Sequence, residues 1–222
     1  MTQARYEIDH VWMLVEHGAP EAELFRALGM LVAPPVVHEG QGTVGVPVMF
    51  ENVYLELLSV EDEALASQTV GADYVRRLAW RAEGQAPFGV GLREVATGDP
   101  PLPTERYTAP WLQPGTALQV FSDQSVHEPA LFMLPDYLTY PALKQAFPQV
   151  AQALASKPGA VTGVELTLAH AVERSAPARW IAADGLLAFV DGVTPHLHLV
   201  IEGGAKGERQ DLRPHLPLTI ER

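Results

Sequence analysis

The fold is decided first by residues 6–15, which read YEIDHVWMLV and form an apolar-rich strand candidate with two faces. A helix is predicted next, because Pro20 suits the first helical position and Gly29 is the expected C-terminal stop. Turn residues then separate three further strand candidates, at about 31–38, 43–50 and 53–60. The first sixty residues therefore predict the order strand, helix, strand, strand, strand.

The last sixty residues repeat that order. Residues 161–169 predict a strand, and Ala176-Pro177 opens a short helix that ends near Gly185. The remaining strand candidates are 186–190, 196–202 and 216–221. The repeat favours a duplicated βαβββ module.

Between the two modules the pattern indicates a mixed segment. Its helix candidates are 72–82 and 141–156, with a break at Pro148, and its strand candidates are 88–95, 117–121 and 130–134. We therefore expect the α+β class in a single domain over 1–222. Its parts are a first module at 5–60, an inserted helix and strand segment at 61–160, and a second module at 161–222.

Composition excludes several function classes. The chain has 27 acidic and 15 basic residues, a net charge of −12, which disfavours nucleic acid and anionic membrane surfaces as partners. It has no cysteine, which excludes disulfides, thiolate metal sites and cysteine nucleophiles. Because no apolar run approaches about eighteen residues and no signal-peptide pattern opens the chain, we expect no membrane association and a cytoplasmic location.

Two ionisable residues lie within apolar strands. Alternation places His10 on one strand face with Ile8, Trp12 and Leu14, and Glu56 lies inside the run YLELL at 54–58. A buried carboxylate costs several kcal/mol unless it is paired, hydrogen-bonded or bound to a metal. His10 and Glu56 could thus be a nitrogen and oxygen ligand pair for a divalent metal, or a hydrogen-bonded core histidine and a glutamate bridged to an arginine.

These residues carry a family resemblance. The duplicated βαβββ order, with His10 on the first strand and Glu56 on the fourth, resembles the vicinal oxygen chelate (glyoxalase/bleomycin resistance/dioxygenase) superfamily. Within it, VHEGQGT at 37–43 and FENVYLEL at 50–57 resemble the glyoxalase-like domain proteins. The resemblance implies that two modules form a cup-shaped mixed sheet, that a divalent metal (Zn, Fe, Ni or Mn) binds at its floor, and that a homodimer is plausible.

The resemblance assigns ligand positions to the first and fourth strands of each module. His10 and Glu56 match those of the first module, whereas the second module departs from the pattern because Gly163 falls opposite His10. In the same alignment Glu165 falls opposite Trp12, which is the next residue after His10 on the cup face. If 196–202 is the fourth strand, His198 becomes a third metal ligand, and if 216–221 is, His198 lies on the third strand and faces solvent.

The remaining candidates concern the substrate. His38 precedes the turn GQG at 40–42, where it could be a general base or a surface histidine, and Glu165 is the second candidate for moving protons. Trp12, Tyr54 and Phe50 could line an apolar substrate pocket, although aromatic residues on strands are more often core.

Two functions follow from these candidates, and a structural or partner-binding domain, which a filled cup would support, is the third reading. The first is a metal-dependent lyase, isomerase or dioxygenase of glyoxalase type that acts on a small oxygenated molecule. The second is a non-catalytic binding protein for a small, antibiotic-like molecule. A cavity in which His10 is hydrogen-bonded to protein groups would favour the second function.

Overall fold

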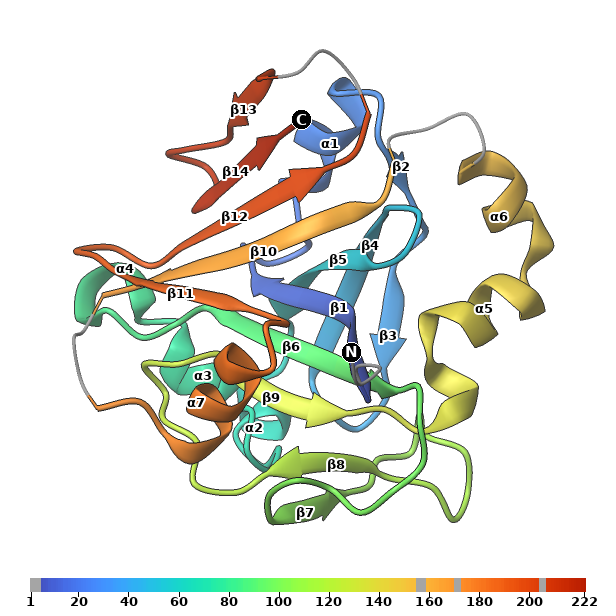
Figure 1. The fold of residues 1–222 in the computed structure, drawn as a ribbon, viewed down its shortest axis with the longest axis vertical. Coiled ribbons are helices and arrows are strands. Elements are labelled where there is room, and N and C mark those ends of the chain that lie inside the picture. The colour runs from blue at the N-terminus through green and yellow to red at the C-terminus, as the bar shows by residue number, and fades with distance from the viewer. Residues whose placement is uncertain (1–4, 155–158, 170–172, 204–206) are drawn as a thin grey trace.

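The computed structural model describes residues 5–154, 159–169, 173–203 and 207–222, whose strands form two mixed sheets that pack against each other (Figure 1). The nine-stranded sheet contains β1 (Tyr6–Leu14), β2 (Leu31–Val32), β3 (Val36–His38), β4 (Thr43–Met49), β5 (Tyr54–Val60), β6 (Phe88–Glu94), β7 (Thr104–Tyr107), β8 (Leu118–Phe121) and β9 (Ala130–Met133). The five-stranded sheet contains β10 (Val161–Leu168), β11 (Ala188–Asp191), β12 (His196–Ile201), β13 (Arg209–Asp211) and β14 (Leu218–Glu221). The expected α+β class is confirmed.

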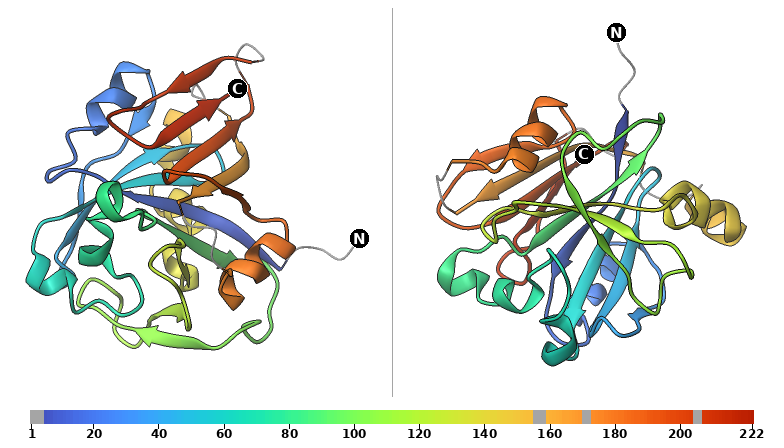
Figure 2. Two further views of the ribbon diagram at one scale, coloured as in Figure 1. Left: turned by 90° about the vertical axis from the view of Figure 1, so that its left-hand side faces the viewer. Right: turned by 90° about the horizontal axis from the view of Figure 1, so that it is seen from below.

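Short helices connect and flank the strands (Figure 2). They are α1 (Ala22–Ala27), α2 (Glu63–Ala66), α3 (Tyr74–Arg77), α4 (Trp80–Glu83), the 3-10 helix η1 (Asp136–Leu138), α5 (Tyr140–Ala146), α6 (Pro148–Leu154) and α7 (Ala176–Ala183). The predicted break at Pro148 separates α5 from α6, which lie together at one side of the molecule in Figure 1. Within the described ranges, no helix has the length and apolar character needed to cross a membrane.

The large sheet consists of two halves that have the same strand order. In the first half, β1 pairs in parallel with β5, which continues through β4 to β2. In the second half, β6 pairs in parallel with β9, which continues through β8 to β7. The halves meet where β1 and β6 pair antiparallel, so one chain supplies both halves of this sheet.

The position of the second half differs from the expected layout. The strands that pair with the first module come from residues 88–133, inside the segment described above as an insert, whereas residues 161–222 form the small sheet. The physical reason lies in the connection between β6 and β7. A stretch with Pro100, Pro101 and Pro103 replaces the helix of a βαβββ unit there, so no helical period marks the repeat.

The small sheet has its own antiparallel centre. There β10 pairs antiparallel with β12, and the two strands pair in parallel with β11 and β14 respectively. Helix α7 joins β10 to β11 and begins as the Ala-Pro motif predicts, since the Ser175 side chain accepts a hydrogen bond from the Ala178 N–H. The buried face of the small sheet, which includes Leu197 and Leu199 of β12, packs in one core cluster with the large sheet.

Alternation along β1 separates the core from the site. Val11 and Met13 face the core between the sheets, whereas Trp12 packs in a second cluster on the opposite face of the large sheet. The prediction for Ile8 is wrong, because this residue packs against the core cluster instead of sharing the face of His10. A β-bulge between the Ile8 and His10 pairs with β6 shifts the register and reverses the alternation.

Candidate functional site

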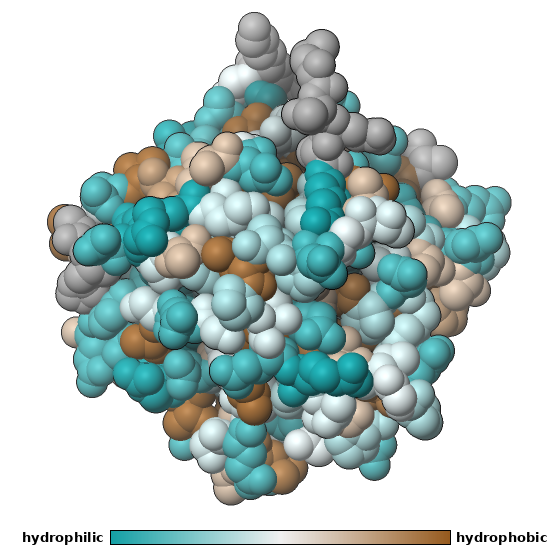
Figure 3. Space-filling view, turned by 60° about the horizontal axis from the view of Figure 1, so that its bottom comes forward, coloured by the Kyte–Doolittle hydropathy of each residue, from teal (hydrophilic) through white to brown (hydrophobic). Residues whose placement is uncertain are grey.

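A pocket of about 440 Å³ lies on the face of the large sheet that is turned away from the small sheet. Both halves of the large sheet, α3, η1 and α5 contribute its lining residues, which are His10, Trp12, Val36, Val37, His38, Gln41, Pro47, Met49, Tyr54, Glu56, Leu58, Tyr74, Trp111, Leu118, Phe132, Leu134, Leu138, Leu143 and Phe147. This volume is in the usual range of small-molecule sites. On the molecular surface drawn in Figure 3, the hydrophobic side chains lie in small groups among hydrophilic ones.

Glycines on neighbouring strands shape the floor of this pocket. A Cβ atom at Gly91 would lie 2.6 Å from the His10 ring, and one at Gly45 would lie 2.0 Å from Oε1 of Glu56. These contacts are closer than real Cβ atoms allow, so only glycine lets the two side chains lie flat across the adjacent strand. The two glycines therefore position His10 and Glu56 in the pocket.

Protein groups hold His10 in place. Its ring stacks on Tyr54 with centroids 4.5 Å apart, and its Nδ1 lies 3.2 Å from Oδ1 of Asp9. Asp9 is fully buried, and its Oδ2 accepts a hydrogen bond of 2.6 Å from the backbone N–H of Tyr140. His10 is thus hydrogen-bonded to a protein group, as the alternative to metal binding expects, and it still lines the pocket.

His38 and Glu56 face each other in the pocket. The His38 Nε2 lies 3.6 Å from Oε1 of Glu56, which is an ion-pair distance longer than a hydrogen bond. Both side chains are largely buried, with exposed fractions of 11% and 9%. On the other side of the ring, His38 Nδ1 lies 2.9 Å from Oγ1 of Thr43. The pair brings two groups that can exchange protons into contact with the cavity.

A buried glutamine that sequence reasoning missed organises this end of the pocket. The Gln41 Oε1 accepts hydrogen bonds from Trp111 Nε1 at 3.2 Å and from Tyr107 OH at 3.0 Å. Because an indole N–H only donates, this contact fixes the amide orientation and leaves Nε2 to donate to Thr43 Oγ1 and Tyr74 OH. The signal available in the sequence was the glutamine between the two glycines of the GQG turn.

The described lining of the pocket contains an acidic residue but no basic one other than histidine. None of its lining residues is lysine or arginine, and Glu56 is the only carboxylic acid among them. Burial, followed by the nearby Glu56 carboxylate, raises the pKa of Tyr54 and also that of Tyr74. Both phenols therefore stay neutral and offer O–H groups at neutral pH.

The donor set does not fit a resident divalent metal. The residues of the second half that correspond to the ligand positions are Gly91, which pairs with His10, and Leu134. Phe132 pairs with Gly91 as Tyr54 pairs with His10, so Leu134, two residues further along, corresponds to Glu56. Neither side chain can bind a metal. Throughout the described part of the chain, no group of three or more His, Cys, Asp or Glu side chains is arranged to hold a metal ion.

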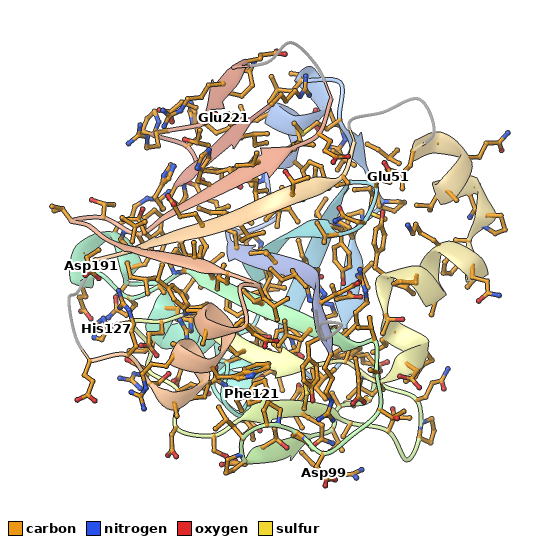
Figure 4. All side chains as sticks on the ribbon, in the orientation of Figure 1. Glu51, Asp99, Phe121, His127, Asp191 and Glu221 are labelled. Carbon is orange, nitrogen blue, oxygen red and sulfur yellow. The ribbon has the colours of Figure 1, made fainter. Side chains whose placement is uncertain are left out.

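The two C-terminal candidates lie on the small sheet. His198 pairs across strands with Glu165, and its Nε2 lies 3.2 Å from Oε2 of Glu221, which Figure 4 labels on β14. Neither His198 nor Glu165 lines the pocket, so the structure does not bring them to His10 and Glu56. The reason is that alternate leucines of β10 and β12 are buried against the large sheet. The polar side chains between them therefore lie on the opposite, partly exposed face of the small sheet.

The three aromatic candidates separate in the same way. Trp12 and Tyr54 line the pocket, whereas Phe50 is fully buried in the core between the sheets. Its backbone carbonyl accepts a hydrogen bond of 2.6 Å from Tyr140 OH. Phe50 is thus placed among core residues and not beside the cavity.

Comparisons with known proteins bear on the fold and the family. Residues 8–98 match the family model described as "Glyoxalase-like domain", and the comparison with curated proteins found no match. A crystal structure of a hypothetical protein from Staphylococcus aureus is similar to this chain with a TM-score of 0.58 at 11% identity, covering 97% of this chain and 98% of that one. This likeness supports the fold over nearly the whole length.

Two further structures are less similar. A methylmalonyl-CoA epimerase in complex with methylmalonyl-CoA and NH4+ has a TM-score of 0.38 at 15% identity, covering 58% of this chain and 93% of that one. A mutant of 4-hydroxymandelate synthase from Streptomyces coelicolor has a TM-score of 0.42 at 11% identity, covering 90% of this chain and 71% of that one. The family match spans β1 through β6, which carry His10, His38 and Glu56. Residues 8–98 thus match a glyoxalase-like domain, in agreement with the family resemblance of the sequence.

Proposed function

We propose that this protein binds a small, largely apolar molecule in the pocket of the large sheet and needs no resident metal to do so. The observation that carries the proposal is the 440 Å³ cavity, whose wall is mostly aliphatic and aromatic and contains a few convergent polar groups. Sites of this composition bind ligands by burying apolar surface, while the polar groups set orientation. His38, Glu56 and Tyr74 are the polar groups that would contact the ligand.

The same site is less suited to metal-dependent lyase, isomerase or dioxygenase chemistry. Such chemistry needs several nitrogen and oxygen donors around one ion. Here His10 stacks on Tyr54 beside Asp9, and the positions that correspond to His10 and Glu56 across the floor are Gly91 and Leu134. The binding function therefore accounts for these residues without assigning them a missing partner.

Ligand titration with a blocked pocket tests the proposal. A panel of aromatic and aliphatic alcohols, ketones, amines and acids would be titrated into the full chain by calorimetry, with indole fluorescence as a second readout because Trp12 and Trp111 line the cavity. Leu134→Trp adds an indole to the wall, and Val193→Trp makes the same kind of change at a residue that is 94% exposed and outside the pocket. Circular dichroism would check that both variants fold.

We expect at least one panel member to bind, Leu134→Trp to weaken it by about tenfold or more, and Val193→Trp to bind as the wild type does. Binding that is unaffected by Leu134→Trp would contradict the assignment of this pocket. A panel without any binding would remove the proposal.

Two predictions about the cellular form accompany this function. The expected homodimer is not required to complete the large sheet, since one chain supplies both halves, and light scattering would measure the oligomeric state. A cytoplasmic location likewise stays a prediction, which fractionation of the source cells would test.

A further inference from the structure

Glu56 is a carboxylate in the pocket without a hydrogen-bond donor from the described residues. The residue is 7% exposed, and its only ion-pair neighbour in that part of the chain is His38, at 3.6 Å. Its Oε1 lies against Gly45, where a Cβ atom would be only 2.0 Å away. A carboxylate buried in this way requires a proton or a partner.

Among the described residues His38 is the ion-pair neighbour of Glu56, but its Nε2 lies beyond hydrogen-bond distance of the carboxylate. His38 uses Nδ1 for its contact with Thr43, and the pocket has no lysine or arginine. The remaining wall includes aromatic side chains, among them Trp12, Trp111 and Phe132. Aromatic faces attract cations through the ring quadrupole, so the wall and the carboxylate favour the same kind of ligand group.

An anionic ligand would meet the opposite situation. A carboxylate or phosphate near Glu56 would bring like charges together in a cavity that lacks a lysine or arginine to compensate them. The whole chain, with a net charge of −12, also repels anions during approach and attracts cations. Both effects act in the same direction.

We propose that the ligand is an organic cation, an amine on an apolar or aromatic skeleton whose ammonium group pairs with the Glu56 carboxylate. The ammonium group brings both the positive charge and the N–H donors that this carboxylate lacks. The aromatic and aliphatic wall holds the skeleton. This inference rests on the proposed binding function and names its ligand class.

A matched series of ligands tests the charge preference without altering the protein. Phenylalkyl amines, alcohols and carboxylic acids with the same chain of two to six methylene groups differ only in the terminal group. Calorimetry on the full chain near neutral pH and physiological salt would measure each dissociation constant. We expect the amine of the best-fitting length to bind about tenfold tighter than its alcohol, and the acid to bind most weakly.

Two variants then assign the preference to one residue. Glu56→Gln should abolish the advantage of the amine and leave the alcohol within about twofold of its wild-type affinity. Glu39→Gln removes the same charge from an exposed position outside the pocket and should preserve the advantage. If Glu56→Gln fails to fold, the comparison of the three ligand classes on the wild type still decides the question.

The possible results separate the two proposals. An acid or alcohol that binds the wild type as tightly as the amine overturns the organic-cation proposal and leaves the binding function in place. An amine preference that survives in Glu56→Gln also overturns it. If no member of the series binds while another panel molecule does, the ligand class is wrong, and if nothing binds in either experiment, the binding function fails as well.

Discussion

Gly89→Ala probes the packing of the pocket floor most directly. Gly89 lies on β6 opposite Trp12, and a Cβ atom there would lie 2.1 Å from Cε2, 2.3 Å from Nε1 and 2.4 Å from Cζ2 of the indole. Trp12 is 2% exposed and its ring lies against Tyr74 with centroids 5.4 Å apart, so the rigid indole has little room to withdraw. The backbone of β6 is also held on both sides, by β1 and β9.

The expected magnitude follows from two opposing effects. Overpacking a buried site costs about 1–3 kcal/mol, and the fixed indole places this site toward the upper part of that range. Replacing a glycine that has ordinary backbone angles returns about 0.4–1 kcal/mol through the unfolded state. The net loss of unfolding free energy is therefore about 1–2.6 kcal/mol, which at a urea slope of about 2 kcal/mol/M lowers the midpoint by about 0.5–1.3 M.

Urea unfolding followed by circular dichroism measures this shift. Gly163→Ala is the matched control, because Gly163 lies on β10 of the small sheet and a Cβ atom there would lie 3.3 Å from the side chain of Val200. We expect the midpoint of the control to stay within about 0.3 M of the wild type. If Gly89→Ala unfolds at the wild-type midpoint or above it, the indole is not packed against this strand and the described pocket floor is incorrect.

Three further predictions concern the chemistry of the site. Gly45→Ala would push the flexible Glu56 carboxylate aside, so we expect amine binding to weaken while the urea midpoint changes little; unchanged calorimetric affinity would contradict the position given to Glu56. Elemental analysis of purified protein should find substoichiometric Zn, Fe, Ni and Mn, and added Zn²⁺ should leave the melting temperature unchanged; retention of a full equivalent would refute the argument from the donor set. Burial, with Glu56 adding to it, raises the pKa of Tyr54, so the unfolded chain loses this proton first and stability falls as pH rises above about 10. Tyr54→Phe should make that decline in unfolding free energy less steep, and an unaltered slope would show that Tyr54 does not titrate on unfolding.

The first half of the large sheet could be predicted from the sequence because each of its elements has a local signal. Residues 6–15 alternate between two faces, Pro20 and Gly29 bound a helical segment, and the GQG turn at 40–42 separates two strands. The family match over 8–98 begins in the same stretch. Local patterns therefore carried enough information to place His10, Trp12 and Glu56 on one sheet.

The second half of that sheet has weaker local signals. Its strands are short, such as β7 with four residues, and its crossover is a proline-containing loop instead of a helix. The C-terminal region, by contrast, has an Ala-Pro helix start and a glycine stop that match the first module well. Helix boundaries are local features, whereas the sheet that a strand joins depends on long-range pairing, so the better local match indicated the wrong sheet partner for 161–222.

The site was predictable to the extent that it depends on alternation within β1 and β5. The contribution of Gln41 and Trp111 depends on contacts between residues 70 positions apart, which no periodicity reports. Long-range pairing also explains why His198 does not line the pocket, since the strand that carries it pairs within the small sheet. Sequence patterns thus identified the floor of the pocket but not its walls.

Glu56 is an ionisable residue of an apolar strand and also a lining residue of the pocket. An ionisable residue inside YLELL predicts a partner, and the three partners considered were an arginine, a metal and a hydrogen-bond donor. The structure places no arginine at the pocket, no third metal ligand beside it and no donor within hydrogen-bond distance among the described residues. Gly45 lies where a larger residue would displace the carboxylate, so the surrounding backbone is shaped to keep the charge at the cavity. A cationic group of the ligand would offset the cost of burying this charge, and the cavity gives that group a route to the carboxylate.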